Sequence, residues 1–309
     1  MKLLLLSLVL FLLSACGVSS ESAENEMNQK INVVATTSHV RDLAEQVGGE
    51  HVEVNSLMGP GVDPHEYQPS ASDVHKLTQS DVTIYNGLHL EGMFSSVFEE
   101  LNRIDKPTLE LASGLDDGMI LRSDEEDLEY DPHIWFSVEN WKRSADNVAE
   151  FLGKHDPEHK DDYLNNALAY KEELDELNEY ILSRVEEIPS NKRYLVTAHD
   201  AFQYFASDYD FEVIGIQGLN TQSEAGTRDI SQLASFIADK QLNTVFVESS
   251  VSTRNIEALI EAVRSQGHTV ELGGELYSDA LGSPEDDTDT YIDMYRANID
   301  TIVDGLKSE

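Results

Sequence analysis

A regular alternation of short β-rich runs and amphipathic helical segments constrains the fold of this chain more than any other feature of its sequence. Strand-like runs over residues 31–36, 51–57, 81–85 and 108–111 are separated by segments with helical periodicity. This alternation is typical of parallel sheets that carry helices on both faces. The first part of the chain is therefore predicted to form an α/β lobe.

A long helical stretch follows this first series of elements. Residues 138–185 are helical in pattern and are interrupted near Asp156 and Pro157. Pro157 and the acidic residues after it are typical of a helix start, which predicts one helix over residues 157–187. At 1.5 Å per residue this helix would be roughly 45 Å long, enough to join two domains rigidly.

The alternation resumes after Pro189. The predicted strands are residues 194–197, 211–216, 244–248 and 268–272, and the predicted helices are residues 201–207, 227–240, 253–265 and 288–306. We therefore predict an α/β fold with two (β/α) lobes that contain parallel sheets, joined by one long bridging helix. The N-terminal lobe is assigned to residues 31–140, the helical segment to 141–188 and the C-terminal lobe to 189–309.

The first 30 residues are not expected to belong to either lobe. Lys2 precedes an apolar run over residues 3–13, which is too short to span a bilayer but has the length of a signal-peptide core. The run leads into the segment LSACG, in which small residues precede Cys16, the only cysteine. This arrangement is typical of a bacterial lipoprotein processing site.

We therefore predict a signal peptide over residues 1–15, lipidation of Cys16, and a flexible tether over residues 16–30, which is rich in Ser, Glu and Asn. The mature protein would stand on the outer face of the bacterial cell membrane. An ordinary signal peptide with an incidental cysteine is the alternative. Lipidation is favoured because a single cysteine cannot form an internal disulfide.

The charge balance excludes one class of partner. The chain has 59 acidic and 21 basic residues, for a formal net charge of -38. Nucleic-acid binding is excluded because phosphate recognition needs clustered Lys and Arg. The acidic residues are spread along the whole chain, which favours a solvated surface suited to saline surroundings over a cation-binding patch.

Two copies of the tripeptide Asp-Pro-His, at residues 63–65 and 131–133, indicate a metal site. Proline fixes its own φ and restricts the residue before it, so each histidine follows a stiff turn. His199 and Asp279 also lie near the ends of strand-like runs, where ligands of open parallel sheets bind. We predict that four residues bind one ion in the cleft between the lobes: His65, His133, His199 and Asp279.

Three imidazoles and one carboxylate suit Zn²⁺ or Mn²⁺. Four protein ligands leave no obligatory position for water, as in a site that holds a metal without using it. Asp63, Asp131 and Glu248 are candidates for orienting the imidazole rings. The other histidines are interpreted as surface or packing residues, although the first of them could line the mouth of the cleft: His39, His51, His75, His89, His155, His159 and His268.

Several segments together resemble the metal-binding solute-binding lipoproteins of zinc and manganese ABC importers, the zinc-uptake complex component A-like family. The matching segments are VVATTS (residues 33–38), GPGVDPHEY (59–67), DPHIW (131–135), TAHDAF (197–202), FVESS (246–250) and GELYSDAL (274–281). The resemblance covers residues 31–306 and the lipoprotein processing site.

This resemblance implies two (β/α) lobes bridged by one long helix, with the metal bound between them. It places the ligand role on the same four residues. It also implies that a monomeric binding protein delivers its ion to a membrane permease driven by a cytoplasmic ATPase.

The resemblance leaves manganese and zinc both open. Many zinc-specific members carry a His-rich loop before the second ligand. In this chain the corresponding segment, residues 114–132, is acidic and contains no histidine. Many manganese-specific members have glutamate where this chain has His199. The segments around Gln217 and Tyr277 are closer to manganese-type members, so the balance is slightly toward manganese.

Two other functions are compatible with parts of the sequence. A zinc hydrolase is one alternative, since His65-Glu66 begins like the motif His-Glu-x-x-His, but Pro69 occupies the position of the second histidine. A hydrolase would also need an open coordination position and a general base. A surface adhesin with a structural metal is the other alternative, and it does not exclude transport.

Overall fold

The first lobe is built on a parallel sheet. The computed structural model describes residues 30–125, 128–222 and 225–307, so the predicted signal peptide, Cys16 and almost all of the tether lie outside the described residues. Four parallel strands follow the order β2-β1-β3-β4: β1 (Ile31–Ala35), β2 (Val52–Ser56), β3 (Val82–Tyr85) and β4 (Thr108–Glu110). The helices of this lobe are α2 (Ser38–Gly48), α3 (Ala71–Gln79) and α4 (Ser95–Arg103).

The second lobe contains two parallel strand pairs. Strand β5 (Tyr194–Thr197) pairs with β6 (Glu212–Gly215), and β7 (Thr244–Glu248) pairs with β8 (Glu271–Leu276). Strands β5 and β7 lie side by side. The helices of this lobe are α7 (Gln203–Tyr209), α8 (Thr227–Lys240), α9 (Arg254–Ser265) and α10 (Tyr291–Lys307).

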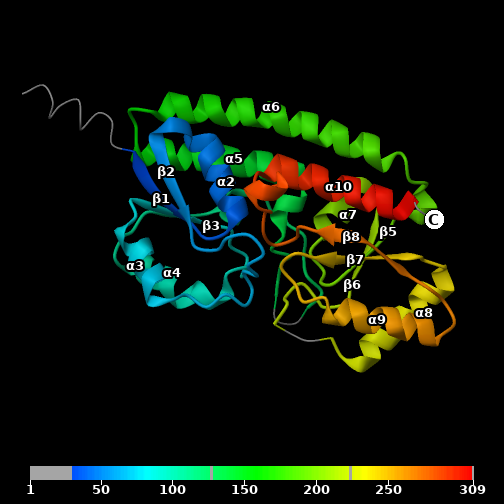
Figure 1. Ribbon diagram of the computed structural model, residues 1–309. Coiled ribbons are helices and arrows are strands. Elements are labelled where there is room, and N and C mark those ends of the chain that lie inside the picture. The colour runs from blue at the N-terminus through cyan, green and yellow to red at the C-terminus, as the bar shows by residue number, and fades with distance from the viewer. Residues whose placement is uncertain (1–29, 126–127, 223–224, 308–309) are drawn as a thin grey trace, which may run out of the picture.

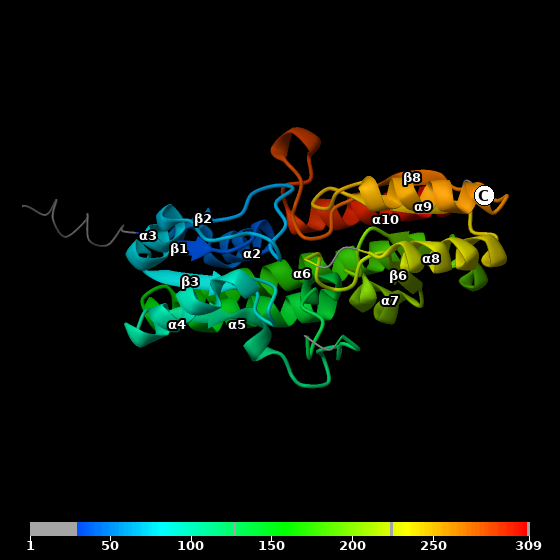
Figure 2. The ribbon, with the colours of Figure 1, turned by 90° about the horizontal axis from the view of Figure 1, so that it is seen from below.

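A shared helical layer joins the lobes. Helix α5 (Val138–His155) packs along α6 (Lys160–Val185), and α6 also contacts α2 of the first lobe and α10 of the second. In both views α3 and α4 lie at one end of the molecule and α8 and α9 at the other (Figures 1 and 2). One buried apolar cluster runs through both lobes and includes Leu43, Leu177 and Ile299. The lobes therefore share part of their core, and each also has a smaller buried cluster of its own.

The predicted fold class is confirmed, with two differences in detail. Helix α6 has 26 residues and begins at Lys160, so it is about 39 Å long, whereas a start at Pro157 was predicted. The chain turns first, because the carboxylate of Asp156 binds the ring of His159 and the hydroxyl of Tyr163. The lobe boundaries at residues 140 and 188 stay predictions.

The second difference concerns β8, which was predicted over residues 268–272 but spans Glu271–Leu276. The strand continues through Gly273 and Gly274 because a Cβ at Gly273 would lie 2.5 Å from the ring of Phe246, so only glycine fits this close approach. Glycine weakens a strand pattern, so the sequence predicted that the strand ends at residue 272, before the two glycines. Among the described residues, no helix is both long and apolar enough to cross a membrane.

Candidate metal centre

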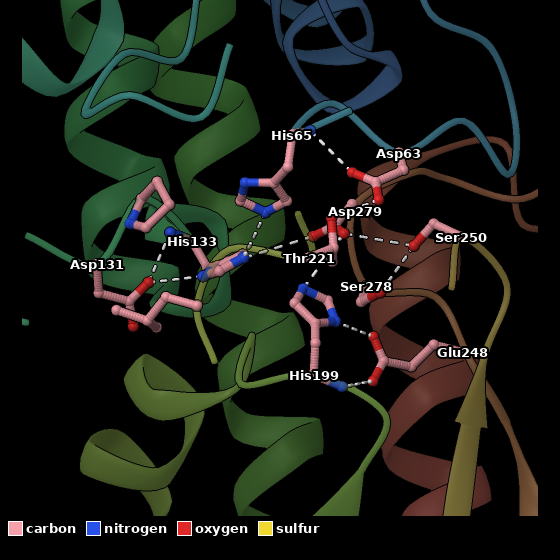
Figure 3. A network of polar contacts seen from close by, with 12 residues as sticks. Asp63, His65, Asp131, His133, His199, Thr221, Glu248, Ser250, Ser278 and Asp279 are labelled. Carbon is pink, nitrogen blue, oxygen red and sulfur yellow. Dashed lines mark hydrogen bonds and ion pairs between the residues drawn. The ribbon is translucent and has the colours of Figure 1, made fainter. Parts of the chain in front are cut away.

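The four predicted ligands meet between the lobes. His65 lies in the loop after β2, His133 in the loop before α5, His199 in the loop after β5, and Asp279 in the loop after β8 (Figure 3). One potential ligand atom from each residue lies within 4.8 Å of all the others, and all four side chains are buried. His133 lies at the end of a long loop that separates it from β4.

Three distances within the cluster match the dimensions of a coordination sphere. His65 Nε2 lies 3.4 Å from His133 Nε2, and His133 Nε2 lies 3.6 Å from Asp279 Oδ1. His199 Nε2 lies 3.3 Å from Asp279 Oδ2. A tetrahedral ion with ligands at about 2.0–2.1 Å separates neighbouring ligand atoms by roughly 3.4 Å. The ring planes are inclined by 58° to 78°, so the nitrogen atoms can face a common centre.

Carboxylates hold two of the three imidazole rings. His133 Nδ1 lies 2.7 Å from Asp131 Oδ1, and His199 Nδ1 lies 2.5 Å from Glu248 Oε2. Each of these partners binds the ring nitrogen remote from the cluster, which leaves Nε2 to face the centre. A carboxylate in this position fixes both the tautomer and the orientation of a metal-binding histidine. The ring-orienting role predicted for Asp131 and Glu248 agrees with these contacts.

The two Asp-Pro-His turns are alike in the backbone and different in the side chains. In each turn an aspartate Oδ1 accepts the backbone N–H of the histidine two positions on, at 2.8 Å for Asp63 and 2.9 Å for Asp131. Asp131 also reaches the ring of its own histidine, but no contact joins Asp63 to the ring of His65 in the described structure. The ring-orienting role predicted for Asp63 is therefore wrong.

Burial and the neighbouring charges set the ionisation of the cluster. Burial lowers the pKa of His199, but Asp279 and Glu248 outweigh this effect and raise it well above its usual range. Burial raises the pKa of Asp279, yet the three histidines together hold it well below its usual value. Burial lowers the pKa of His65 to about 3. In the metal-free site these shifts favour an ionised Asp279, a protonated His199 and a neutral His65.

Sequence reasoning missed the polar residues that contact this cluster from the second lobe. Ser250 Oγ lies 3.4 Å from Asp279 Oδ2 and 3.0 Å from Ser278 Oγ. Thr221 donates to Asp63 and Gln222 donates to the backbone of His65. Ser250 and Ser278 lie in matching segments that could have drawn attention to them, whereas Thr221 and Gln222 carry no such local signal.

His39 is a packing residue, in agreement with the general interpretation of the remaining histidines, and it does not line the mouth of a cleft. It is buried and stacks on Trp135 with 4.8 Å between ring centroids, and neither ring nitrogen has a hydrogen-bond partner among the described residues. Burial lowers its pKa to about 3, so this imidazole is neutral. Trp135 in turn packs edge-on against His133, so His39 belongs to the packing around the site.

Two cavities differ in their relation to the cluster. One of about 260 Å³ lies beside it and is lined by Asp63, Thr221 and Ser250 among others. A larger cavity of about 730 Å³ lies in the first lobe between Tyr85 and Tyr130, and neither cavity is lined by any of the four cluster residues. The smaller cavity is the one adjacent to the metal-binding geometry.

Comparison with known proteins identifies the family. The profile of the family described as "Zinc-uptake complex component A periplasmic" matches residues 33–305. The chain belongs to this family. Zinc-uptake component A proteins are transport components that act outside the cytoplasm and are not enzymes.

Relatives of this zinc-uptake component A protein cover almost its whole length. It is 43% identical over 297 residues to the manganese-binding lipoprotein MntA of Bacillus subtilis, and this match covers 96% of each chain. It is 30% identical over 308 residues to the manganese ABC transporter substrate-binding lipoprotein PsaA of Streptococcus pneumoniae, covering 98% of this chain and 97% of PsaA. The solved periplasmic zinc-binding protein TroA of Treponema pallidum is 42% identical, with a TM-score of 0.86, and the match covers 90% of this chain and 99% of TroA.

Proposed function

We propose that this protein captures one Mn²⁺ or Zn²⁺ ion with His65, His133, His199 and Asp279 and delivers it to the permease of an ABC importer. The observation that carries this proposal is the buried convergence of three imidazoles and one carboxylate between two lobes. Neutral imidazole and carboxylate are ligands that both ions accept. Relatives named for manganese and for zinc support the same pair of cargoes.

The arrangement favours holding an ion over reacting with it. Four protein ligands fill a tetrahedral sphere, so a hydrolytic water has no reserved position. The two carboxylates that approach Nδ1 atoms of the cluster, those of Asp131 and Glu248, are already engaged by those rings. A zinc hydrolase needs an open coordination position and a free general base, so transport is the better interpretation.

Metal analysis of the full-length protein, purified in detergent, tests this function. We expect one Mn²⁺ or Zn²⁺ per chain, lost on chelation and restored by either ion. Zinc is expected to displace manganese in vitro because affinity rises toward the later divalent metals, so growth rescue under manganese or zinc limitation should identify the physiological cargo. A protein that binds neither ion, or that hydrolyses ester or peptide substrates when loaded with metal, would contradict the proposal.

We also propose that the mature chain is a monomer anchored to the outer face of the cell membrane through lipid on Cys16, after removal of residues 1–15. The support is the small-residue segment before the only cysteine, together with relatives named as lipoproteins. Replacing Cys16 with alanine should move the protein from the membrane fraction to the soluble fraction without changing metal binding. Retention of the Cys16→Ala protein on the membrane would refute lipid anchoring.

A further inference from the structure

The three imidazoles of the cluster are not supported in the same way. Carboxylates hold the rings of His133 and His199 through Nδ1, at 2.7 and 2.5 Å. For His65, the only ring hydrogen bond among the described residues joins its Nε2 to His133 Nε2. This hydrogen bond would be lost once both nitrogen atoms face an ion. The position of His65 therefore depends on how its backbone is held.

Two residues of the opposite lobe hold that backbone. Thr221, which Figure 3 labels beside the cluster, donates a hydrogen bond of 2.6 Å from its Oγ1 to Asp63 Oδ2. Gln222 Nε2 donates one of 2.6 Å to the backbone oxygen of His65. Thr221 and Gln222 follow β6 of the second lobe, whereas the turn follows β2 of the first. The second lobe thus binds the first Asp-Pro-His turn at two points: the side chain of Asp63, before the proline, and the backbone oxygen of His65, after it.

The carboxylate of Asp63 transmits this contact to the ligand. Its Oδ2 receives the Thr221 hydroxyl, while its Oδ1 receives the backbone N–H of His65 at 2.8 Å. The planar carboxylate of Asp63 thus connects Thr221 of the second lobe to the ligand residue His65. Thr221 is itself buried, and Gln217 Nε2 donates to its backbone oxygen at 3.0 Å. The contact forms one wall of the 260 Å³ cavity beside the cluster.

We propose that Thr221 and Gln222 are positioning residues that hold the His65 turn against the bound ion and thereby set the rate of metal release. This proposal rests on the proposed function, because it needs an ion bound by His65. Among variants of one binding interface, differences in affinity arise mostly from the dissociation rate, and we expect the same of contacts across this cleft. His65 is then the first ligand to leave, because its ring lacks the carboxylate that holds each of the other two.

Release kinetics of the full-length protein loaded with Zn²⁺ test this role. The variants are Thr221→Val, which removes the hydroxyl at nearly constant shape, Gln222→Ala, and the pair combined. Transfer of zinc to an excess of a chromophoric chelator gives the release rate. A hydrogen bond to a carboxylate is stronger than one to a carbonyl, so we expect release about tenfold faster for Thr221→Val and roughly threefold faster for Gln222→Ala.

Three control variants separate positioning from general destabilisation. Thr221→Ser keeps the donor and should release zinc like the unmodified protein. Thr253→Val removes a hydroxyl that donates to Glu257 in α9, and Gln241→Ala removes an amide that donates to the backbone of Ala238; neither residue contacts the cluster. Both should leave the release rate unchanged. The melting temperatures of the metal-free proteins are measured in parallel.

The outcomes are distinct. Faster release in the Thr221 and Gln222 variants, with normal release for Thr221→Ser and both remote controls, supports the proposal. Unchanged release in the double variant would overturn it, as would an equal acceleration in the remote controls. If the unmodified protein binds no metal, the proposed function fails, whereas normal binding with unchanged release in the double variant defeats only the positioning role.

Discussion

Replacing Asp279 with asparagine is expected to weaken metal binding by roughly 10²- to 10⁴-fold, equivalent to about 3–5 kcal/mol. Asp279 is the only anionic member of the cluster, and it is buried. Its carboxylate offsets the charge of the ion in surroundings that screen charge poorly, while asparagine keeps the shape and removes the charge. Isothermal titration with Mn²⁺, and competition with a chelator for Zn²⁺, measure the loss.

A matched control for this substitution is Asp175→Asn. Asp175 is exposed and forms an ion pair with Lys142, at 2.8 Å, so removing its charge tests the effect of net charge alone. We expect the Asp175→Asn protein to bind metal like the unmodified one. Affinities of Asp279→Asn and Asp175→Asn that agree within threefold would show that Asp279 is not a ligand.

Acidification is expected to weaken metal binding by about tenfold per pH unit, or roughly 100-fold between pH 7 and pH 5. The metal-free site holds a proton on His199, because Asp279 and Glu248 raise its pKa well above the usual range despite burial. Binding requires a neutral imidazole, so each bound ion must displace this proton. His65 adds nothing to the pH dependence over this range, because burial lowers its pKa to about 3.

Calorimetry in two buffers with different ionisation enthalpies measures this proton directly. One proton should be released per ion at pH 7. A binding constant that is the same at pH 7 and pH 5 would contradict the protonated His199. In the metal-free protein the same raised pKa contributes stability that is fully present below the unfolded pKa of about 6.5 and is lost as the pH rises through the folded value.

Glu248→Gln sharpens this prediction. The amide keeps a hydrogen-bonding group near His199 Nδ1 but removes the charge that helps to raise the pKa of this histidine. The number of protons released at pH 7 should therefore fall below one, and the affinity should vary less steeply with pH. Loss of the orienting carboxylate should also lower the affinity at high pH by roughly 10- to 100-fold.

The sequence predicted most of the fold because the relevant signals are local. Strand β1 and helix α8 follow directly from runs whose periodicity is undisturbed by their neighbours. The end of β8 was predicted wrongly because Phe246 and the helix α10, both distant in sequence, pack against its two glycines. The local sequence pattern indicates that the strand ends before Gly273, whereas packing against Phe246 and α10 accommodates a strand that continues through both glycines.

The ligand candidates were also accessible from the sequence, since a stiff Asp-Pro-His turn and a polar residue at a strand end are recognisable wherever they occur. The supporting contacts were accessible only in part. Asp131 could be identified because it lies two positions from His133, and Glu248 because it lies at the end of a predicted strand. Asp63 has the same spacing from its histidine as Asp131, but its second oxygen binds the opposite lobe.

By itself the sequence determined the alternation that builds two lobes, the long helix between them and the types of residue that could bind a metal. Only the tertiary structure decided which groups meet. Thr221 and Asp63 are 158 positions apart, and Gln222 and His65 are 157 apart, yet they form two of the contacts that hold a ligand in place. Such pairs leave no local pattern, because their proximity depends on how the shared helical layer places one lobe against the other.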